Sequence, residues 1–205
     1  MSAAGLVARR NAVGWSFALN AVCFASWAAR VPTARETLGI SNAALGLLLL
    51  TIAAGSLIGL PLTGSLVGRW GTRAVVRGGG LATSAGLCAT ALGLGAARDP
   101  ATAMAIVAGG LLVYGIGIAV WDVAMNIEGA DVERELGRAI MPRFHAGWSI
   151  GAAAGAALGA GVVHAGIAAT PHLTLVGVTA LAVATWTSSP FGSSPADPSP
   201  GPAQG

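Results

Sequence analysis

Residues 43–67 read AALGLLLLTIAAGSLIGLPLTGSLV and contain no charged side chain. The hydrocarbon core of a bilayer is roughly 30 Å thick, so about 20 apolar residues suffice for one helix to cross it. The stretch is too long for a β-strand and lacks the alternation of polar and apolar residues that a strand shows. A helix of a soluble bundle would carry a charged face, which is missing here. Residues 43–67 therefore predict a transmembrane α-helix.

The same pattern recurs along the chain. Predicted transmembrane helices cover residues 11–29, 43–67, 75–97, 101–124, 144–168 and 173–187. Prolines, glycines and charged residues, which end helices, stand between these blocks. The pattern predicts an all-α membrane protein with a bundle of six transmembrane helices over residues 11–187.

The composition excludes several classes of protein. The 205 residues are 54% hydrophobic and only 9% charged, whereas soluble domains average about 25% charged residues. The basic residues lie between apolar blocks rather than in a phosphate-tracking patch, which argues against nucleic-acid binding. The sequence shows no Walker motif, nucleophile elbow or His/Cys metal cluster, so we expect no enzyme, cofactor or metal site. Cys23 and Cys88 lie in apolar runs and are interpreted as packing residues.

The arginines predict the orientation. All eleven basic residues are arginine, and eight of them fall in cytoplasmic segments if residues 1–10 are cytoplasmic. The other three are Arg30, Arg35 and Arg98. This excess fits the positive-inside rule and predicts a cytoplasmic N-terminus. More apolar blocks follow the first one, so we interpret it as a retained helix and not a cleaved signal peptide.

The end of the chain has a different composition. Residues 188–205 read SSPFGSSPADPSPGPAQG. Such a Pro/Ser/Gly tract has almost nothing to bury, so we expect a disordered tail.

A basic turn separates the second and third blocks. It contains Gly64, Arg69, Gly71 and Arg73. This spacing resembles the cytoplasmic signature between helices two and three of the major facilitator superfamily. Gly68 stands where that family usually has Asp, so the charge-relay and gating contact of this Asp is not expected here. The alternative is a basic turn that only obeys the positive-inside rule.

A carboxylate and an amide lie near the end of the fourth block. Asp122 and Asn126 are four residues apart and share one helix face. An acid at the end of an apolar helix is costly and usually faces a cavity or a partner. We therefore expect Asp122 to take up and release a proton. The alternative is that Asp122 only marks where the helix leaves the bilayer.

The fifth block opens with a polar group of its own. His145 and Ser149 are i, i+4 neighbours, and Trp148 lies close to their face. Residues 122–151 resemble the fucose-permease-like branch of the superfamily and its uncharacterised bacterial inner-membrane relatives. The resemblance implies that Asp122, Asn126 and His145 help to form a solute cavity. Sugar-binding members often have Gln at the position of His145, so a sugar is not implied, and the alternative is an interfacial histidine.

The first block carries a stripe of Asn20, Cys23, Trp27 and Arg30 on one helix face. Asn20 and Trp27 are candidates for the solute pathway, Trp27 by stacking on a ring. Arg30 is expected at the membrane interface, and the alternative is that it attracts an anion.

Glycines recur at every fourth residue of the fifth block. The positions are Gly147, Gly151, Gly155 and Gly159. Small residues let membrane helices pack closely, so we interpret this stripe as a packing surface. Residues 128–143 carry nearly balanced charges and predict a solvated or self-paired cytoplasmic helix.

The resemblance covers residues 10–187 and implies the N-terminal six-helix half of a twelve-helix facilitator, whose substrate lies between two halves. It implies a proton-coupled secondary carrier of a small polar solute in the bacterial inner membrane. The expected partners are the lipid bilayer, the solute, protons, and a complementary C-terminal half or a second copy. We expect a truncated or frameshifted carrier. The alternatives are a non-transporting membrane subunit or assembly partner that uses the glycine stripes, and a homodimer that rebuilds a carrier.

Overall fold

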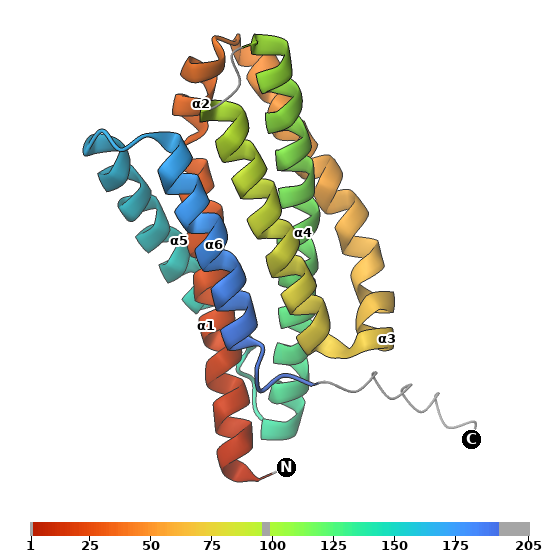
Figure 1. Cartoon of the computed structure of the whole chain (residues 1–205). Coiled ribbons are helices and arrows are strands. Elements are labelled where there is room, and N and C mark those ends of the chain that lie inside the picture. The colour runs from red at the N-terminus through yellow and green to blue at the C-terminus, as the bar shows by residue number, and fades with distance from the viewer. Residues whose placement is uncertain (1, 96–98, 193–205) are drawn as a thin grey trace.

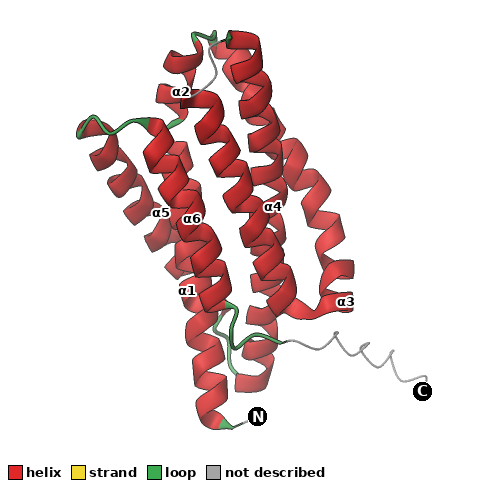
Figure 2. Ribbon diagram, viewed as in Figure 1, coloured by secondary structure: helices red, strands yellow, loops and turns green. Residues whose placement is uncertain are grey.

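The computed structural model describes residues 2–95 and 99–192, and this part of the chain contains helices and connections but no strand (Figure 2). The helices are α1 (Ala3–Ala28), α2 (Val31–Leu38), α3 (Asn42–Gly95), α4 (Pro100–Leu136), α5 (Met141–His164) and α6 (Ala169–Thr187). Arg98, which was expected outside the cytoplasm, lies outside the described residues. So do residues 193–205, which form most of the expected disordered tail.

Five helices of the described part are long and apolar enough to cross a membrane. They are α3, α4, α5, α6 and the segment Ala3–Leu38, which combines α1 and α2. The fold is therefore that of an all-α, multi-pass membrane protein.

Helix α3 is not one continuous rod. Its 54 residues would extend roughly 80 Å as a straight helix. The backbone leaves helical geometry at Gly71, where φ is 76° and ψ is 161°. Glycine adopts this region of positive φ at little cost, whereas other residues are strained there. The chain therefore turns sharply at Gly71, and the two arms of α3 lie on either side of this corner (Figure 1).

The turn at Gly71 helps to define the two ends of the bundle. One end, called here the N-terminal end, holds the start of α1, the Gly71 turn, the α4–α5 connection and the end of α6 (Figure 1). The opposite end, called here the α2 end, holds α2 and the α5–α6 connection.

Several helices extend beyond the apolar blocks. Helix α1 begins at Ala3 rather than residue 11, with Ser2 as N-cap accepting a hydrogen bond from the Gly5 amide at 3.2 Å. Helix α4 continues past residue 124 and ends at Gly137, which has a φ of 62°. The short α2 was not expected. Charged residues end an apolar block, but they do not prevent backbone hydrogen bonding within a helix. The helices are therefore longer than the predicted transmembrane spans.

Glycines bring helices α3 and α4 into close contact. A Cβ atom on Gly55 would lie 2.2 Å from the Leu112 carbonyl oxygen, and one on Gly115 would lie 2.2 Å from that of Ile52. Farther along the pair, a Cβ on Gly117 would lie 2.3 Å from the Thr83 amide nitrogen. Only glycine leaves room for backbones this close.

The glycine stripe of α5 lies against α1. A Cβ on Gly151 would approach the Ala18 carbonyl oxygen to 2.1 Å, and those on Gly155 and Gly159 would meet α1 atoms at 2.8 and 2.5 Å. Gly147 is different, because its Cβ would meet nothing closer than 3.8 Å. Most of the stripe therefore packs two helices of the same chain together.

The residues that follow α6 depart from the expected tail. Ser188 and Phe191 are buried, with exposed fractions of 0% and 1%. Phe191 joins the core cluster that contains Trp121 and Phe144. The Phe191 ring and hydrogen bonds to Arg73 and Glu128 hold residues 188–192 against the bundle.

Candidate functional site

A cavity of about 300 Å³ lies where four helices meet. It is lined by Asn20 and Phe24 of α1, Ser56 and Leu60 of α3, Ile118, Ala119 and Asp122 of α4, and Trp148 of α5. We call it the solute cavity. Three of the predicted site residues, Asn20, Asp122 and Trp148, therefore come together from three different helices.

The polar atoms of the solute cavity are few and specific. Asn20 is 2% exposed, and its Nδ2 has no hydrogen-bond partner among the described residues. Ser56 Oγ donates to the Gly115 carbonyl at 3.2 Å. Asp122 is half-buried and adds a carboxylate. A buried amide without a partner carries a free-energy cost, which a bound hydrogen-bond acceptor would remove.

Two aromatic rings form an apolar wall of the cavity. The ring centroids of Phe24 and Trp148 lie 6.3 Å apart, with an angle of 36° between the planes. The cavity therefore offers a flat apolar surface beside its polar groups.

The other predicted site residues lie outside this lining. Asn126 donates its Nδ2 hydrogen to the backbone carbonyl of Asp122 at 2.9 Å and so bonds to its own helix. The exposed His145 packs edge-on against Phe17, with ring centroids 5.2 Å apart. Trp27 is 2% exposed and belongs to a core cluster with Leu48, so it is not placed to stack on a solute.

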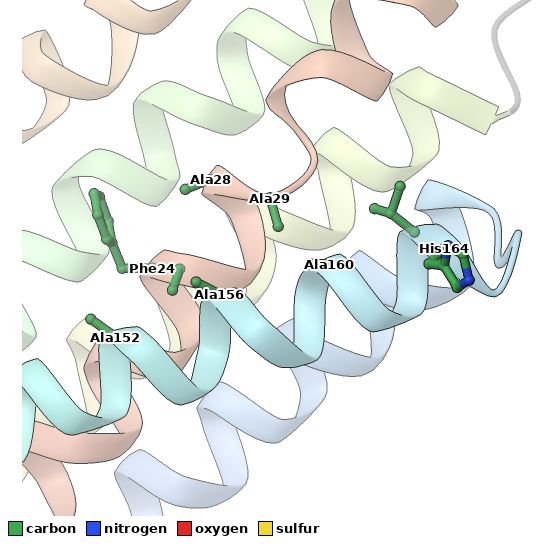
Figure 3. A pocket seen from close by; sticks show the side chains of 9 residues that line it. Phe24, Ala28, Ala29, Ala152, Ala156, Ala160 and His164 are labelled. Carbon is green, nitrogen blue, oxygen red and sulfur yellow. The ribbon is translucent and has the colours of Figure 1, made fainter.

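A second, larger cavity runs between α1 and α5. Its volume is about 730 Å³, and most of the residues that line it are alanines, including Ala152, Ala156 and Ala160 (Figure 3). It shares Phe24 with the solute cavity. Its wall offers little to bind a polar solute.

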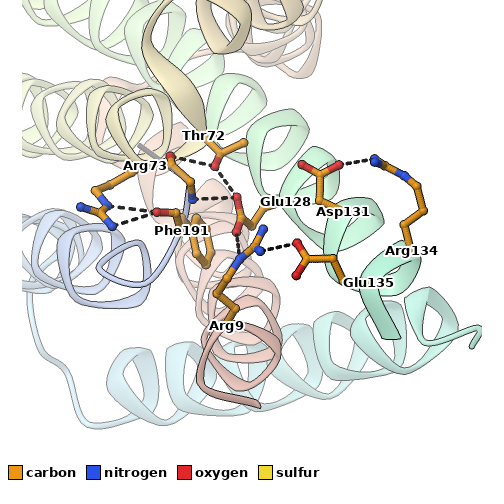
Figure 4. A network of polar contacts seen from close by, with 9 residues as sticks. Arg9, Thr72, Arg73, Glu128, Asp131, Arg134, Glu135 and Phe191 are labelled. Atoms are coloured by element: carbon orange, nitrogen blue, oxygen red, sulfur yellow. Dashed lines mark hydrogen bonds and ion pairs between the residues drawn. The ribbon is translucent and has the colours of Figure 1, made fainter. Parts of the chain in front are cut away.

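A buried ion-pair network at the N-terminal end was not predicted. Glu128 is 1% exposed and accepts a hydrogen bond from Arg9 Nε at 2.6 Å, while Arg9 Nη1 donates to Glu135 at 2.6 Å (Figure 4). Thr72 Oγ1 and the Gly192 amide also donate to the Glu128 carboxylate. The network, called here the Glu128 network, joins α1, α3, α4 and the segment after α6.

The expectation of a solvated or self-paired segment over residues 128–143 is therefore wrong for Glu128. It holds for Asp131 and Arg134, which pair with each other. The missed signal is helical spacing, because Glu128 shares its face with the buried residues Trp121, Ala124 and Met125.

The basic turn between the arms of α3 binds the segment after α6. Arg73 donates from Nε and Nη2 to the Phe191 carbonyl at 3.2 and 2.9 Å (Figure 4). Arg69 lies 5.7 Å above the ring of its neighbour Trp70. Gly64 and Gly68 face open space, since nothing lies within 4 Å of a Cβ built on either.

A second buried arginine lies at the α2 end. Arg30 is 2% exposed, donates from Nε to His172 Nδ1 at 2.9 Å, and donates from Nη2 to the Ile167 carbonyl at 2.7 Å. It was expected at the membrane interface. Its bonds join the end of α1 to the start of α6, and its position relative to the membrane interface stays a prediction.

Comparison with known proteins identifies relatives. Over 141 residues the chain is 43% identical to an uncharacterized MFS-type transporter of Yersinia pestis, covering 69% of this chain and 35% of the relative. Over 147 residues it is 37% identical to an uncharacterized transporter of Sinorhizobium fredii (strain NBRC 101917 / NGR234), covering 72% of this chain and 37% of the relative.

The chain thus spans about a third of the length of the curated relatives it matches. No family model and no solved structure matches it. The sequence identity to curated transporters, together with the five long apolar helices, makes this chain a relative of the MFS-type transporters, the major facilitator superfamily.

Proposed function

We propose that the chain supplies one half of the solute pathway of a proton-coupled secondary carrier for a small polar solute. The observation that carries the proposal is the solute cavity, in which a buried amide without a partner, Asn20, lies near the carboxylate of Asp122. The named relatives are transporters, which supports the same function.

The proposed topology has six membrane spans and a cytoplasmic N-terminus. The Gly71 turn divides α3 into two arms, each long enough for one span. Arg69 and Arg73 stand two residues before and after Gly71, and Arg73 lies at the same end of the bundle as Arg9 (Figure 4). This concentration of arginines supports a cytoplasmic N-terminal end by the positive-inside rule. A bacterial inner membrane is the proposed location.

Each group in the cavity has a proposed role. The Asn20 amide donates to an acceptor oxygen or nitrogen of the solute, and the rings of Phe24 and Trp148 contact its apolar surface. Asp122 is the proposed proton carrier, because it supplies the carboxylate among the residues that line the cavity. Solute binding that favours one protonation state of Asp122 would couple the two ligands reciprocally.

The Glu128 network supports rocking of the bundle as a unit. Alternating access in transporters built from repeats is largely a rigid-body movement of one repeat against the other. Arg9, Thr72, Glu128 and Gly192 tie four separate segments together at one end. A complementary half or a second copy of this chain would provide the opposite wall of the pathway.

The packing of α5 argues against the assembly-partner alternative. That reading needs the glycine stripe to be free for another chain. Gly151, Gly155 and Gly159 instead lie against α1 of the same chain.

Proton flux provides the test. The chain would be reconstituted into liposomes that contain a pH-sensitive dye, alone and together with the remaining part of a full-length relative. A panel of neutral, cationic and anionic small polar solutes would then be added outside. We expect at least one solute to drive proton movement and the Asp122→Asn variant to abolish that movement.

Asp131→Asn is the matched control, because it removes a carboxylate that pairs only with the neighbouring Arg134 on the same helix. We expect it to keep full proton flux. Flux that is equal in wild type and Asp122→Asn would overturn the assignment of the proton to Asp122.

A further inference from the structure

A basic pocket lies toward the N-terminal end, between residues 10–18 of α1 and the start of α5. Its volume is about 470 Å³. The residues that line it are Arg10, Asn11, Gly14, Trp15 and Ala18 of α1, together with Ile140, Arg143 and Phe144. It shares no lining residue with the solute cavity.

The pocket holds two positive charges and no lining carboxylate. Arg10 donates from Nε and Nη2 to Asn11 Oδ1 at 3.1 and 2.8 Å, and this neutral amide leaves its charge uncompensated. The guanidinium of Arg143 forms no hydrogen bond or ion pair with the described residues. The Glu133 carboxylate accepts the Ile140 and Met141 amides at 2.6 and 2.7 Å and does not line the pocket.

Arg9, the neighbour of Arg10 on α1, differs from the two pocket arginines in having counter-ions. The neighbouring arginine on α1 makes ion pairs with both Glu128 and Glu135. The chain therefore provides carboxylates for the buried guanidinium of Arg9 and none for the two that open into the pocket.

Apart from Asn11, the rest of the pocket wall is apolar. Trp15 is 55% exposed, while Phe144 is 4% exposed and closes the back. Tryptophan is enriched where a membrane helix meets the headgroup region. Gly14 and Ala18, which have little or no side chain, continue the pocket wall along α1 from Arg10.

We propose that this pocket binds an anionic phospholipid. The guanidinium groups of Arg10 and Arg143 hold the lipid phosphate and headgroup, and the acyl chains run along Trp15 and Ala18. Basic pockets between transmembrane helices are suited to anionic lipid headgroups, and guanidinium groups bind phosphate oxygens in pairs. The site would anchor the start of α1 to the start of α5.

Lipid titration of the purified full chain in detergent tests the proposal, independently of any transport. Phosphatidylglycerol and phosphatidylcholine with identical acyl chains would be added, and bound lipid counted by native mass spectrometry. We expect saturable binding of phosphatidylglycerol, at least 10-fold tighter than that of phosphatidylcholine. The Arg10→Gln/Arg143→Gln variant is expected to lose this preference.

Arg138→Gln is the matched control, since it removes an exposed arginine close to α5 that does not line the pocket. It should bind phosphatidylglycerol like the wild type. Arg10→Lys/Arg143→Lys keeps both charges and should retain most of the preference, even if the glutamine variant folds poorly.

Three outcomes would overturn the site. The first is equal binding of the two lipids by the wild type. The second is an equal loss in the Arg138→Gln control. The third is displacement of phosphatidylglycerol by millimolar inorganic phosphate, which would show a site for free anions instead of lipid.

Discussion

The two ends of the bundle each bury an arginine, and they hold it in different ways. At the N-terminal end, Arg9 pairs with the carboxylates of Glu128 and Glu135. At the α2 end, Arg30 bonds to the imidazole of His172 and to the backbone carbonyl of Ile167. The first arrangement depends on charge, and the second depends on an uncharged acceptor. The two ends should therefore respond differently to mutation and to pH.

The largest effect is expected when the Glu128 network loses its central acid. Glu128→Ala leaves the guanidinium of Arg9 without its buried partner, and breaking a buried ion pair costs about 3–5 kcal/mol. Thr72 and Gly192 lose their acceptor in the same step. Unfolding in mixed detergent–SDS micelles, followed by circular dichroism, would measure the loss.

Glu135→Ala is the control for this prediction. The Glu135 side chain is 42% exposed, so its pair with Arg9 should contribute less than about 1 kcal/mol. If the two alanine variants are equally stable, the Glu128 network does not hold this end together.

The α2 end should show an intermediate effect that depends on pH. His172 Nδ1 accepts from Arg30, so the bond exists only while this nitrogen carries no proton. Protonation replaces the bond by two facing cations and leaves a buried donor unsatisfied, which costs about 1–3 kcal/mol. We expect the stability of the wild type to be highest at neutral pH and to fall as the pH drops toward 5.

His172→Gln sharpens this comparison, because an amide oxygen accepts from Arg30 at any pH. We expect it to flatten the pH dependence, whereas His164→Gln, which alters an exposed histidine, should leave the dependence unchanged. A wild type and a His172→Gln variant with parallel pH profiles would show that this bond does not respond to pH.

The smallest effect is expected at the start of α4, where Asp99 caps the helix. Its Oδ2 accepts from the Thr102 amide and hydroxyl at 2.8 Å each, and these bonds lower the pKa of the carboxyl below its ordinary value. A lowered pKa in the folded state means that the stabilisation is present above pH 3.8 and is lost as the pH falls further.

The Asp99→Ala variant should therefore be slightly less stable than the wild type at pH 7, and the difference should shrink as the pH falls below 3.8. Asp99→Asn keeps an acceptor and should retain most of the cap. Thermal unfolding at a series of pH values checks both, and a constant difference between wild type and Asp99→Ala would contradict the prediction.

The candidate site was predictable where polarity is rare. Asn20, Asp122 and Trp148 stand out in apolar helices, and the structure places all three around one cavity. Helical spacing put Trp27 on the same face of α1 as Asn20, but only Asn20 lines the cavity. Farther along the helix, the same face packs into the core, where Trp27 is buried. Ser56 was missed, since a single serine in an apolar block is ordinary in membrane helices.

The sequence by itself determined the class of fold and the number of apolar blocks. The hydrophobic effect and the cost of unpaired backbone groups in lipid leave helices as the only solution for such blocks. The local sequence also placed a turn at Gly71, between two apolar blocks. The backbone conformation there is one that most other residues cannot adopt without strain.

Only the tertiary structure decided which rare polar residues pair. Arg9 and Glu128 are 119 positions apart in the chain, and Arg30 and His172 are 142 apart. No local rule joins such residues, because their pairing depends on how the helices are ordered and rotated in the bundle. Close backbone contacts at glycines favour particular helix neighbours. The buried charged residues then pair with the polar groups that this arrangement places next to them.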